Sequence, residues 1–504
     1  WLAEHTDGLA EVAAVMREVS VADYLAVADV PEDLVCAAVR RIAAAGSVAI
    51  LEDLGVQMNR NSTTVSYVEK LLWLLTGNFA KRGTQYVFSG LAPIARDRGQ
   101  PFELIPRTPV SGAAIVSGLI PCNSIPDEIL TDHPDRFRAV IVESSNPLHS
   151  LADSARMTEA FRALELVVVI DIALTETARE ADYVLPPPTQ YEKYEATFFD
   201  FEFPRNLFHL RHPLLDAPAG QLAEPEIHAR LCELSGAVGE ADYAPLRAAL
   251  TQGREAFAQA MLGVLADRRL AKLAPVLLYR TLGPTLPDGA AAAAVLWGAS
   301  LMCAMENPAG VARAGYGEGL MAGDRLFEAI LASPHGVVIT DDEDDASWQR
   351  LGGRRIQLDV PELLDVVRKL GDDEAVITDS DYPLVLSAGE RRDFTANTIL
   401  RDPAWRKRDP EGALRVSQED AAAWSLATGD RVRVCTRRGS AEAVLTVVDT
   451  MRQGHISLPN GLGLASQDGE QVGVRLNNLT ASADRDEFVG TPWHKSVPAR
   501  LEKI

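Results

Sequence analysis

Short polar side chains and one carboxylate follow two apolar segments whose composition is typical of neighbouring strands. The polar residues are Ser144, Ser145, Asn146 and Asp171. The first three follow the segment Arg138–Glu143, and the last ends the apolar run that begins at Glu165. In open α/β sheets, ligands bind beyond the carboxyl ends of the strands, and an acid after the second strand suits a ribose hydroxyl. We therefore predict a nucleotide-like ligand at this edge.

A simpler interpretation stays open at this point. Asn146 could only turn the chain and Asp171 could only cap a helix, and spacing does not decide between the two interpretations. No glycine-rich phosphate loop precedes Asp171, since the glycine-rich stretches that begin at residues 315 and 461 lie elsewhere. This disfavours a nicotinamide cofactor, which needs such a loop next to the first strand.

Cysteines and histidines do not form the patterns that metal sites or catalytic triads require. The five cysteines are Cys36, Cys122, Cys232, Cys303 and Cys435. Their wide spacing disfavours an iron–sulfur or zinc site within these residues and favours free thiols in a reducing compartment. His149, His209 and His212 have no acid or serine at a telling spacing, so we assign them no catalysis.

The elements that position the polar residues follow from hydrophobic periodicity. Met157, Ala160, Phe161 and Leu164 recur at helical spacing between the two strands, and a third short strand is expected at 181–185. Strand, helix and strand at this spacing predict a right-handed βαβ unit in a doubly wound sheet. Earlier in the chain we expect helices at 31–45 and 64–75 and a short strand at 47–51.

From Asp381 onward the pattern changes to short strands separated by turns. The expected strands are 382–387, 431–436, 443–448 and 455–458. Short strands with regular turn signals predict a small β-barrel or sandwich. We therefore expect residues 1–90 to be the remainder of an α/β domain, 91–377 an α/β domain, and 378–504 a C-terminal β-barrel.

Composition excludes some partners. The chain has 504 residues, of which 71 are acidic and 49 basic, for a net charge of −22. Nucleic acid is excluded as a partner, because phosphate binding needs a basic face. The apolar run 289–305 falls short of the ~20 residues that a membrane span needs, so we expect a buried helix there and no membrane segment. The acidic run 341–345 is expected to be a solvated loop.

Several motifs resemble one enzyme family, the molybdopterin oxidoreductases. The sequence ESSNP (143–147) resembles the family's G-E-N-P loop, and VVIDIALTETAREADYVLP (168–186) closely resembles its D-x-x-x-T-E-T-A-x-x-A-D-x-V-L-P signature. Further matching stretches are LLTGNFAKRG (74–83), YEKYEATF (191–198), SAGERRDFTANT (387–398), the segment 417–439, RLNNLT (475–480) and TPWHK (491–495). The resemblance covers nearly the whole chain and is weakest in 237–375.

The resemblance implies an α/β fold with doubly wound Rossmann-like domains and a C-terminal β-barrel of the double-psi type. It also implies bis-molybdopterin guanine dinucleotide with molybdenum or tungsten as cofactor. The residues expected to bind it are Ser144, Ser145, Asn146, Asp171, Thr175, Arg391, Arg392, Asn397, Asn477, Asn478 and Lys495. Plainer roles stay open, since the two arginines could be surface charges, the 477–478 pair a turn and the 175–177 segment a helix start.

By resemblance, the chain is similar to the C-terminal two-thirds of such an enzyme, most of all to formate dehydrogenases and assimilatory nitrate reductases. The family's metal ligand and its 4Fe–4S cluster would then lie in a preceding segment, so no catalytic residue is assigned here. The implied partners are a small-molecule substrate and an electron-transfer protein, and the implied location is the cytoplasm. A cofactor-binding fragment without turnover of its own stays open as the alternative.

Overall fold

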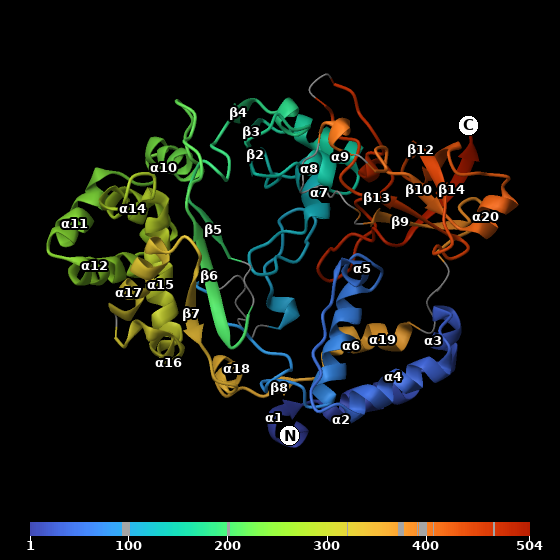
Figure 1. Cartoon of the computed structure of the whole chain (residues 1–504), viewed down its shortest axis with the longest axis horizontal. Helices are drawn as coiled ribbons and strands as arrows, with labels where there is room; N and C mark the ends of the chain where they lie inside the picture. The colour runs from blue at the N-terminus through green and yellow to red at the C-terminus, as the bar shows by residue number, and fades with distance from the viewer. Residues whose placement is uncertain are drawn as a thin grey trace. The chain divides into compact units, whose positions relative to one another are not determined.

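The computed structural model describes residues 1–92, 101–198, 202–319, 321–370, 377–390, 392, 401–406, 408–466 and 469–504 (Figure 1). Its contacts divide it into two compact units. Unit 1 comprises Trp1–Asn78, Asp97–Val184 and Arg355–Ile504, and unit 2 comprises Phe79–Arg96 and Leu185–Arg354. The two boundaries between the three predicted domains stay predictions.

In unit 1, the predicted βαβ unit is present. Its sheet has the order β2-β3-β4, with β2 (Ala139–Glu143), β3 (Leu166–Ile170) and β4 (Tyr183–Leu185). β2 and β3 are parallel, and Glu143 is in register with Ile170. The accompanying helices are η2 (Cys122–Ser124), α7 (Ile125–Leu130), α8 (Pro147–Ser150), α9 (Ser154–Arg162) and η3 (Ala178–Glu180). Met157 and Phe161 of α9 pack on Val142 and Val169, which explains the helical spacing of these apolar residues.

The C-terminal barrel of unit 1 confirms the prediction from short strands. Its strands are β9 (Leu384–Glu390), β10 (Leu414–Val416), β11 (Arg431–Thr436), β12 (Ser440–Val447), β13 (His455–Pro459) and β14 (Val497–Lys503). They close in the order β10-β12-β11-β14-β9-β13. β9 and β13 are parallel, as are β10 and β12. The barrel region also contains η8 (Pro403–Trp405), α20 (Gln418–Ala423) and η9 (Leu476–Asn478).

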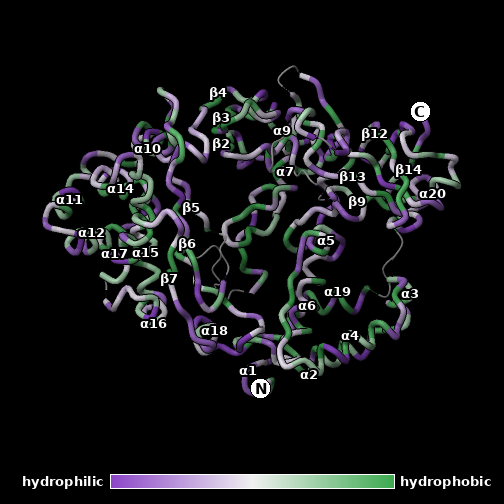
Figure 2. Tube along the Cα trace, in the orientation of Figure 1, coloured by the Kyte–Doolittle hydropathy of each residue, from purple (hydrophilic) through white to green (hydrophobic). Residues whose placement is uncertain are grey.

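The N-terminal part of unit 1 is mostly helical. Its elements are α1 (Leu2–His5), β1 (Thr6–Asp7), α2 (Leu9–Glu18), α3 (Val21–Ala28), α4 (Glu32–Ala44), α5 (Leu54–Gln57), α6 (Ser62–Leu75) and η1 (Phe102–Leu104), with β8 (Ile356–Gln357) and α19 (Pro361–Lys369) from later in the chain. The strand predicted at 47–51 is wrong, because that segment pairs with no strand. α4 forms as predicted, but its apolar stripe is not buried: Leu34 is 60% and Val39 51% exposed. Figure 2 shows that hydrophobic and hydrophilic residues alternate along this helix.

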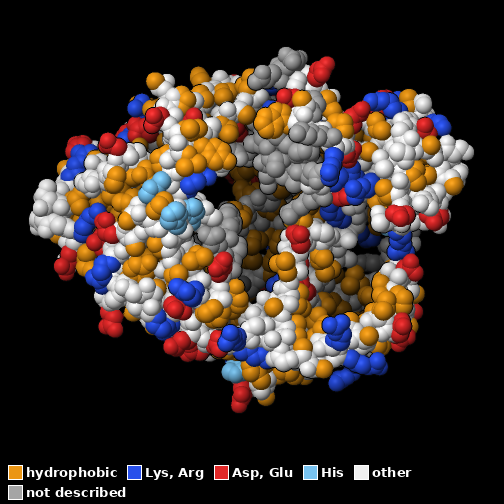
Figure 3. Space-filling model, in the orientation of Figure 1, with side chains coloured by type: hydrophobic (Ala, Val, Ile, Leu, Met, Phe, Trp, Pro, Cys, Tyr) orange, Lys and Arg blue, Asp and Glu red, His pale blue; other side chains and the backbone are white. Residues whose placement is uncertain are grey.

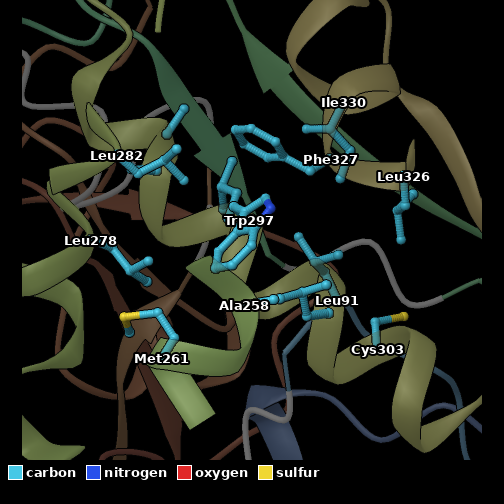
Figure 4. Packing of buried hydrophobic residues seen from close by; sticks show 14 of the residues in the cluster. Leu91, Ala258, Met261, Leu278, Leu282, Trp297, Cys303, Leu326, Phe327 and Ile330 are labelled. Atoms are coloured by element: carbon cyan, nitrogen blue, oxygen red, sulfur yellow. The ribbon is translucent and has the colours of Figure 1, made fainter. Parts of the chain in front are cut away.

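Unit 2 combines a small antiparallel sheet with a helical core. Its sheet comprises β5 (Glu195–Thr197), β6 (Arg205–Arg211) and β7 (Val337–Asp341). Its helices are α10 (Glu224–Leu234), α11 (Glu240–Thr251), α12 (Arg254–Ala266), α13 (Arg268–Lys272), α14 (Ala274–Thr281), η4 (Gly283–Thr285), η5 (Ala291–Ala293), α15 (Ala294–Glu306), α16 (Pro308–Val311), η6 (Ala312–Tyr316), α17 (Met321–Ala332) and α18 (Ala346–Arg350). Trp297, Phe327 and Leu282 point into one core (Figure 4).

The apolar run 289–305 and the acidic run 341–345 of unit 2 each had a predicted structure. The apolar run forms the buried helix α15, as predicted. Among the described residues, no helix combines the length and the apolar character that a membrane span requires. The acidic run 341–345 is not simply a solvated loop: Asp342 is buried, with its carboxylate 2.6 Å from Arg350 and 2.7 Å from the amide of Asn307. On the face shown in Figure 3, acidic and basic side chains are interspersed.

Candidate functional site

The loop that follows β2 positions Asn146 at the carboxyl edge of the sheet. The amide oxygen of Asn146 accepts hydrogen bonds from the backbone N–H and the hydroxyl of Thr177, at 3.1 and 2.8 Å. Its backbone carbonyl accepts the N–H groups of His149 and Ser150 in α8, both at 2.9 Å. Ser144 and Ser145 are exposed, and Ser144 has a positive φ of 50°. The loop is therefore a sharp turn that fixes Asn146 and presents two hydroxyl groups to solvent.

Asp171 ends β3 at the same edge. Its carboxylate is buried and accepts the N–H of Ala173 at 2.9 Å. Burial raises the pKa of Asp171, while the N–H of Ala173 and the nearby Arg401 oppose this shift. Thr175 is buried as well, and its hydroxyl accepts the N–H of Ala178 at 3.0 Å. Thr175 therefore binds the first N–H of η3, which is the helix-start role that the sequence left open.

Glu176 links this edge to the barrel region, and the sequence did not single it out. Its carboxylate accepts hydrogen bonds from the amide of Asn146 at 2.6 Å, the N–H of Ala465 at 3.0 Å and the guanidinium of Arg401 at 3.0 and 3.2 Å. Burial opposes ionisation, but these bonds prevail and lower the pKa of Glu176 to about 2. The Glu of the T-E-T-A signature was the available sequence signal, but it also fitted a helix start.

A cavity of about 470 Å³ lies beside this network, between α8, α5 and the ends of barrel strands β9 and β13. Asn477 and Lys495, both predicted from the barrel motifs, line it. The amide nitrogen of Asn477 donates to the carbonyl of His149 at 2.8 Å, which ties η9 to α8. The ammonium of Lys495 donates to the carbonyls of Ala388 and Gly389 at 3.1 and 2.9 Å. The structure thus brings two of the predicted residues together.

Among the residues that the structure describes, three buried polar atoms of the cavity wall have no hydrogen-bond partner: Nδ1 of His149, Nε2 of His494 and Oδ1 of Asn460. Burial lowers the pKa of His149 to about 4, although the carboxylate of Glu176 opposes the shift. Burial and the adjacent Lys495 lower the pKa of His494 to about 4 as well. Both imidazoles are therefore neutral at pH 7. Buried polar atoms are rarely left unpaired, so the cavity wall is suited to a polar ligand.

The remaining predicted residues lie elsewhere. Arg392 is held by Glu390 at 2.9 Å and Asp409 at 2.6 Å, so its charge is balanced within the chain. Asn478 is exposed and lines a separate open concavity of about 600 Å³ beside α9. Arg391 and Asn397 lie outside the described residues. Ser144, Ser145, Asn146, Asp171 and Thr175 do not line the 470 Å³ cavity.

Metal ligands were not expected within this chain. In the ranges that the structure describes, no group of three or more His, Cys, Asp or Glu side chains is placed to hold a metal ion. All five cysteines are free thiols, and they are distributed over both units.

Two family models match the chain. Residues 37–233 match "Molybdopterin oxidoreductase", and residues 384–498 match "Molydopterin dinucleotide binding domain". The first match contains Asn146, Asp171, Glu176 and His149, and the second contains the barrel residues of the cavity wall. The two matched segments therefore meet at the cavity of unit 1.

Several curated proteins are similar to parts of the chain. Trimethylamine-N-oxide reductase of Vibrio vulnificus is 39% identical over 83 residues, which is 16% of this chain and 10% of that protein. Formate dehydrogenase 1 subunit alpha of Methanococcus maripaludis is 28% identical over 226 residues, 41% of this chain and 32% of that protein. The molybdopterin-containing subunit of thiosulfate reductase from Salmonella typhimurium is 25% identical over 216 residues, which is 38% of this chain and 28% of that protein. The matched stretches thus span at most about a third of these three relatives.

Acetylene hydratase from Pelobacter acetylenicus is similar in fold, with a TM-score of 0.62 at 17% identity, over 100% of this chain and 67% of that chain. This similarity confirms the expected α/β architecture with a C-terminal barrel. The two matched domains and the similar curated proteins lead to one conclusion: the chain belongs to the molybdopterin oxidoreductase family.

Proposed function

We propose that this chain forms the cofactor-binding part of the catalytic subunit of a molybdopterin-dependent oxidoreductase, and that the cofactor is bis-molybdopterin guanine dinucleotide with molybdenum or tungsten. The observation that supports this most is the cavity whose wall carries polar atoms of His149, His494 and Asn460 that no described residue pairs with. Pterin and guanine rings carry many N–H and carbonyl groups, and such groups pair with neutral nitrogen and amide oxygen atoms. The residues present therefore fit the cofactor.

The bound cofactor would supply two-electron transfer at the metal, while the chain binds and orients it. Asn477 and Lys495 would contact it from the barrel, and the buried Asp171 carboxylate would accept N–H groups of a guanine. Glu176 would not contact the cofactor itself. Its carboxylate would instead position the side chains of Asn146 and Arg401, to which it is hydrogen-bonded. Arg391, Asn397, Ser144, Ser145 and Asn478 stay candidates for cofactor contact. Arg392 and Thr175 already use their polar groups within the chain.

For the reaction, we propose the formate dehydrogenase type, in which formate loses two electrons and one proton to give carbon dioxide. Two formate dehydrogenase alpha subunits of Methanococcus maripaludis match 41% and 47% of this chain, against 38% for the thiosulfate reductase subunit and 16% for the trimethylamine-N-oxide reductase. The two electrons require an acceptor, so we also propose an electron-transfer partner and a 4Fe–4S relay. A nitrate reductase-like reaction and a cofactor-binding role without turnover are the alternatives.

Cofactor content tests the first part of the proposal. We expect the purified chain, after acid and heat treatment, to release fluorescent pterin derivatives and GMP in equal amounts, since each dinucleotide contains one of each. Chain prepared with the substitution His335→Ala, an exposed side chain of unit 2, is the matched control and retains the same content. Purified chain that contains neither compound and takes up neither from a cofactor-loaded extract contradicts the proposal.

Activity tests the second part. Protein isolated from its native cells through an affinity tag is assayed with a dye acceptor and formate, and separately with a dye donor and nitrate. We expect formate-dependent dye reduction in proportion to the metal content of the preparation. Nitrate-dependent dye oxidation without formate oxidation supports the nitrate reductase alternative. Cofactor-loaded protein that turns over neither compound contradicts the proposed reaction.

A further inference from the structure

An open concavity of about 600 Å³ lies along one side of α9. It shares no lining residue with the 470 Å³ cavity. One wall comes from α9, where Ala155 and Ala163 leave room, and the other comes from the start of η9, with Arg475 and Asn478. The concavity is therefore a second recess of unit 1, separate from the proposed cofactor cavity.

Arg475 brings a cation without a counter-ion to the wall of this concavity. Its side chain is half-buried, and its nitrogen Nη2 donates to the carbonyl of Leu148. None of the described acidic side chains forms an ion pair with it, and Glu176, which attracts it at longer range, is already paired with Arg401. Burial lowers the pKa of Arg475. The guanidinium is thus partly desolvated, and no described residue balances its charge directly.

The nitrogen Nη1 is the atom of Arg475 that a ligand can reach. Nε of the same side chain is enclosed, whereas Nη1 is not, and no described residue accepts a hydrogen bond from Nη1. The guanidinium group is planar, so its bond to Leu148 also fixes the direction of Nη1. Arg475 therefore presents a preorganised donor to the recess, which lowers the entropic cost of binding.

Two further side chains add donors to the same recess. Asn478 is exposed, and its amide has no hydrogen-bond partner in the described part of the chain. Arg162 uses Nε and Nη2 for Glu180, at 2.7 and 2.6 Å, which leaves its Nη1 available. Glu159 is the acid among the described lining residues. Two arginines and one glutamate give this wall a net charge of +1, in a chain whose net charge is −22.

We propose that the concavity binds the carboxylate group of a small organic acid, with Arg475 as the principal contact and Arg162 and Asn478 as additional donors. A guanidinium pairs with a carboxylate through charge-assisted hydrogen bonds. The net charge of the wall matches a monoanion, because Glu159 repels the second charge of a phosphate dianion. The two alanines of α9 leave space for the apolar part of the acid, and about 600 Å³ lies within the range of small-molecule sites.

Methyl NMR tests the proposal and locates the ligand. The full chain, as purified, is labelled with ¹³C at its alanine methyl groups and titrated with benzoate in a low-salt buffer. We expect the signals of Ala155 and Ala163 to shift until they saturate, while the signal of Ala44 in α4 does not move. Benzamide has a similar shape without the charge, so it is expected to bind about tenfold more weakly or less.

Three substitutions identify the contacts. Arg475→Met removes the cation but keeps a long side chain, and it is expected to weaken benzoate binding about tenfold. Arg475→Lys retains the charge and restores part of the affinity. Glu159→Gln removes the repelling charge, so benzoate binds about threefold more tightly and inorganic phosphate begins to bind. Arg17→Met, at an exposed position of α2, is the matched control and leaves the affinity unchanged.

Equal affinity of the unsubstituted chain and Arg475→Met for benzoate contradicts the inference, as does equal binding of benzoate and benzamide. Phosphate that binds the unsubstituted chain as tightly as benzoate contradicts the assignment of a monoanion. Because Glu159→Gln acts in the opposite direction to Arg475→Met, its tighter binding cannot arise from a loss of folding. Cofactor content is measured separately, so none of these results decides the proposed function.

Discussion

Glu176 and Arg401 form a two-point ion pair, with Oε1 3.0 Å from Nη1 and Oε2 3.2 Å from Nη2. Glu176 belongs to the signature motif and follows β3, and Arg401 precedes the barrel strand β10. Their side chains are 8% and 18% exposed, so solvent screens the pair little. The ion pair therefore joins the two family domains within unit 1.

Glu176→Gln is expected to destabilise unit 1 by about 3 kcal/mol or more, because it leaves the charge of Arg401 buried without a counter-ion. Glu180→Gln is the matched control. It breaks the ion pair with Arg162, whose side chain is 64% exposed, and costs less than about 1 kcal/mol. Urea unfolding followed by tryptophan fluorescence measures both. Equal midpoints for the two variants contradict the role assigned to Glu176.

The free energy of unfolding is expected to decrease on acidification in two ranges. His149 and His494 have folded-state pKa values of about 4, below the ordinary 6.5, so the unfolded chain binds protons first. Stability is then lost as the pH falls from about 6.5 to 4, by roughly 3 kcal/mol for each residue. Denaturation curves between pH 7 and pH 4 measure this. The loss is smaller in the double variant His149→Phe, His494→Phe, and a loss of the same size in both proteins contradicts the prediction.

In the second, more acidic pH range, stability is lost because Glu176 becomes protonated. Its folded-state pKa of about 2 lies below the ordinary 4.5, so its stabilising effect is present above pH 4.5 and is lost as the pH falls toward 2. Between these values, Glu176→Gln has a flatter dependence of stability on pH than the unsubstituted chain. Parallel curves for the two proteins below pH 4.5 contradict the assignment.

Asp171→Asn is expected to lower the GMP content of purified protein about tenfold, because a charged, buried acceptor is exchanged for a neutral amide. Asp132→Asn, an exposed acid in the same unit, leaves the content unchanged. The ratio of GMP to protein, measured after acid release, decides between them. If Asp171 only terminates its strand, the two variants contain equal amounts.

Asn477 and Asn478 allow a comparison of two adjacent residues. Asn477→Leu removes the hydrogen bond to the carbonyl of His149 and the one from Thr480, and it is expected to cost about 1–3 kcal/mol. Asn478→Leu changes an exposed side chain and costs less than about 0.5 kcal/mol. Hydrogen exchange at α8 increases in the first variant only. Equal exchange in both indicates that the η9 contact does not hold α8.

The elements with strong local patterns could be predicted from sequence. β11 has the predicted bounds of Arg431 and Thr436, since alternating apolar residues and flanking turns define a strand without reference to distant residues. The prediction of a strand at 47–51 failed because a short apolar run does not specify which strand it would pair with. Instead, the N–H of Val48 donates to the side chain of Asn78.

The candidate site was predictable only in part. Asn146 and Asp171 follow adjacent parallel strands, so strand order alone places them at one edge. His149 carried no motif, and its partner His494 lies in another domain, so their shared cavity depends on how the barrel packs. Glu176 resembled a helix-capping acid because local spacing cannot show that Arg401 and Ala465 approach it.

Strand order in the barrel also has a kinetic consequence. β9 is the first barrel strand in the sequence, yet it pairs with β13 and β14, and β14 is the last of the six. Such long-range pairings must close large loops before any contact forms, which slows folding. The segment with His494 and Lys495 directly precedes β14. During synthesis on the ribosome, the wall of the cavity that these two residues build is therefore completed only after β14 has emerged, so a shorter nascent chain does not yet contain the finished cavity.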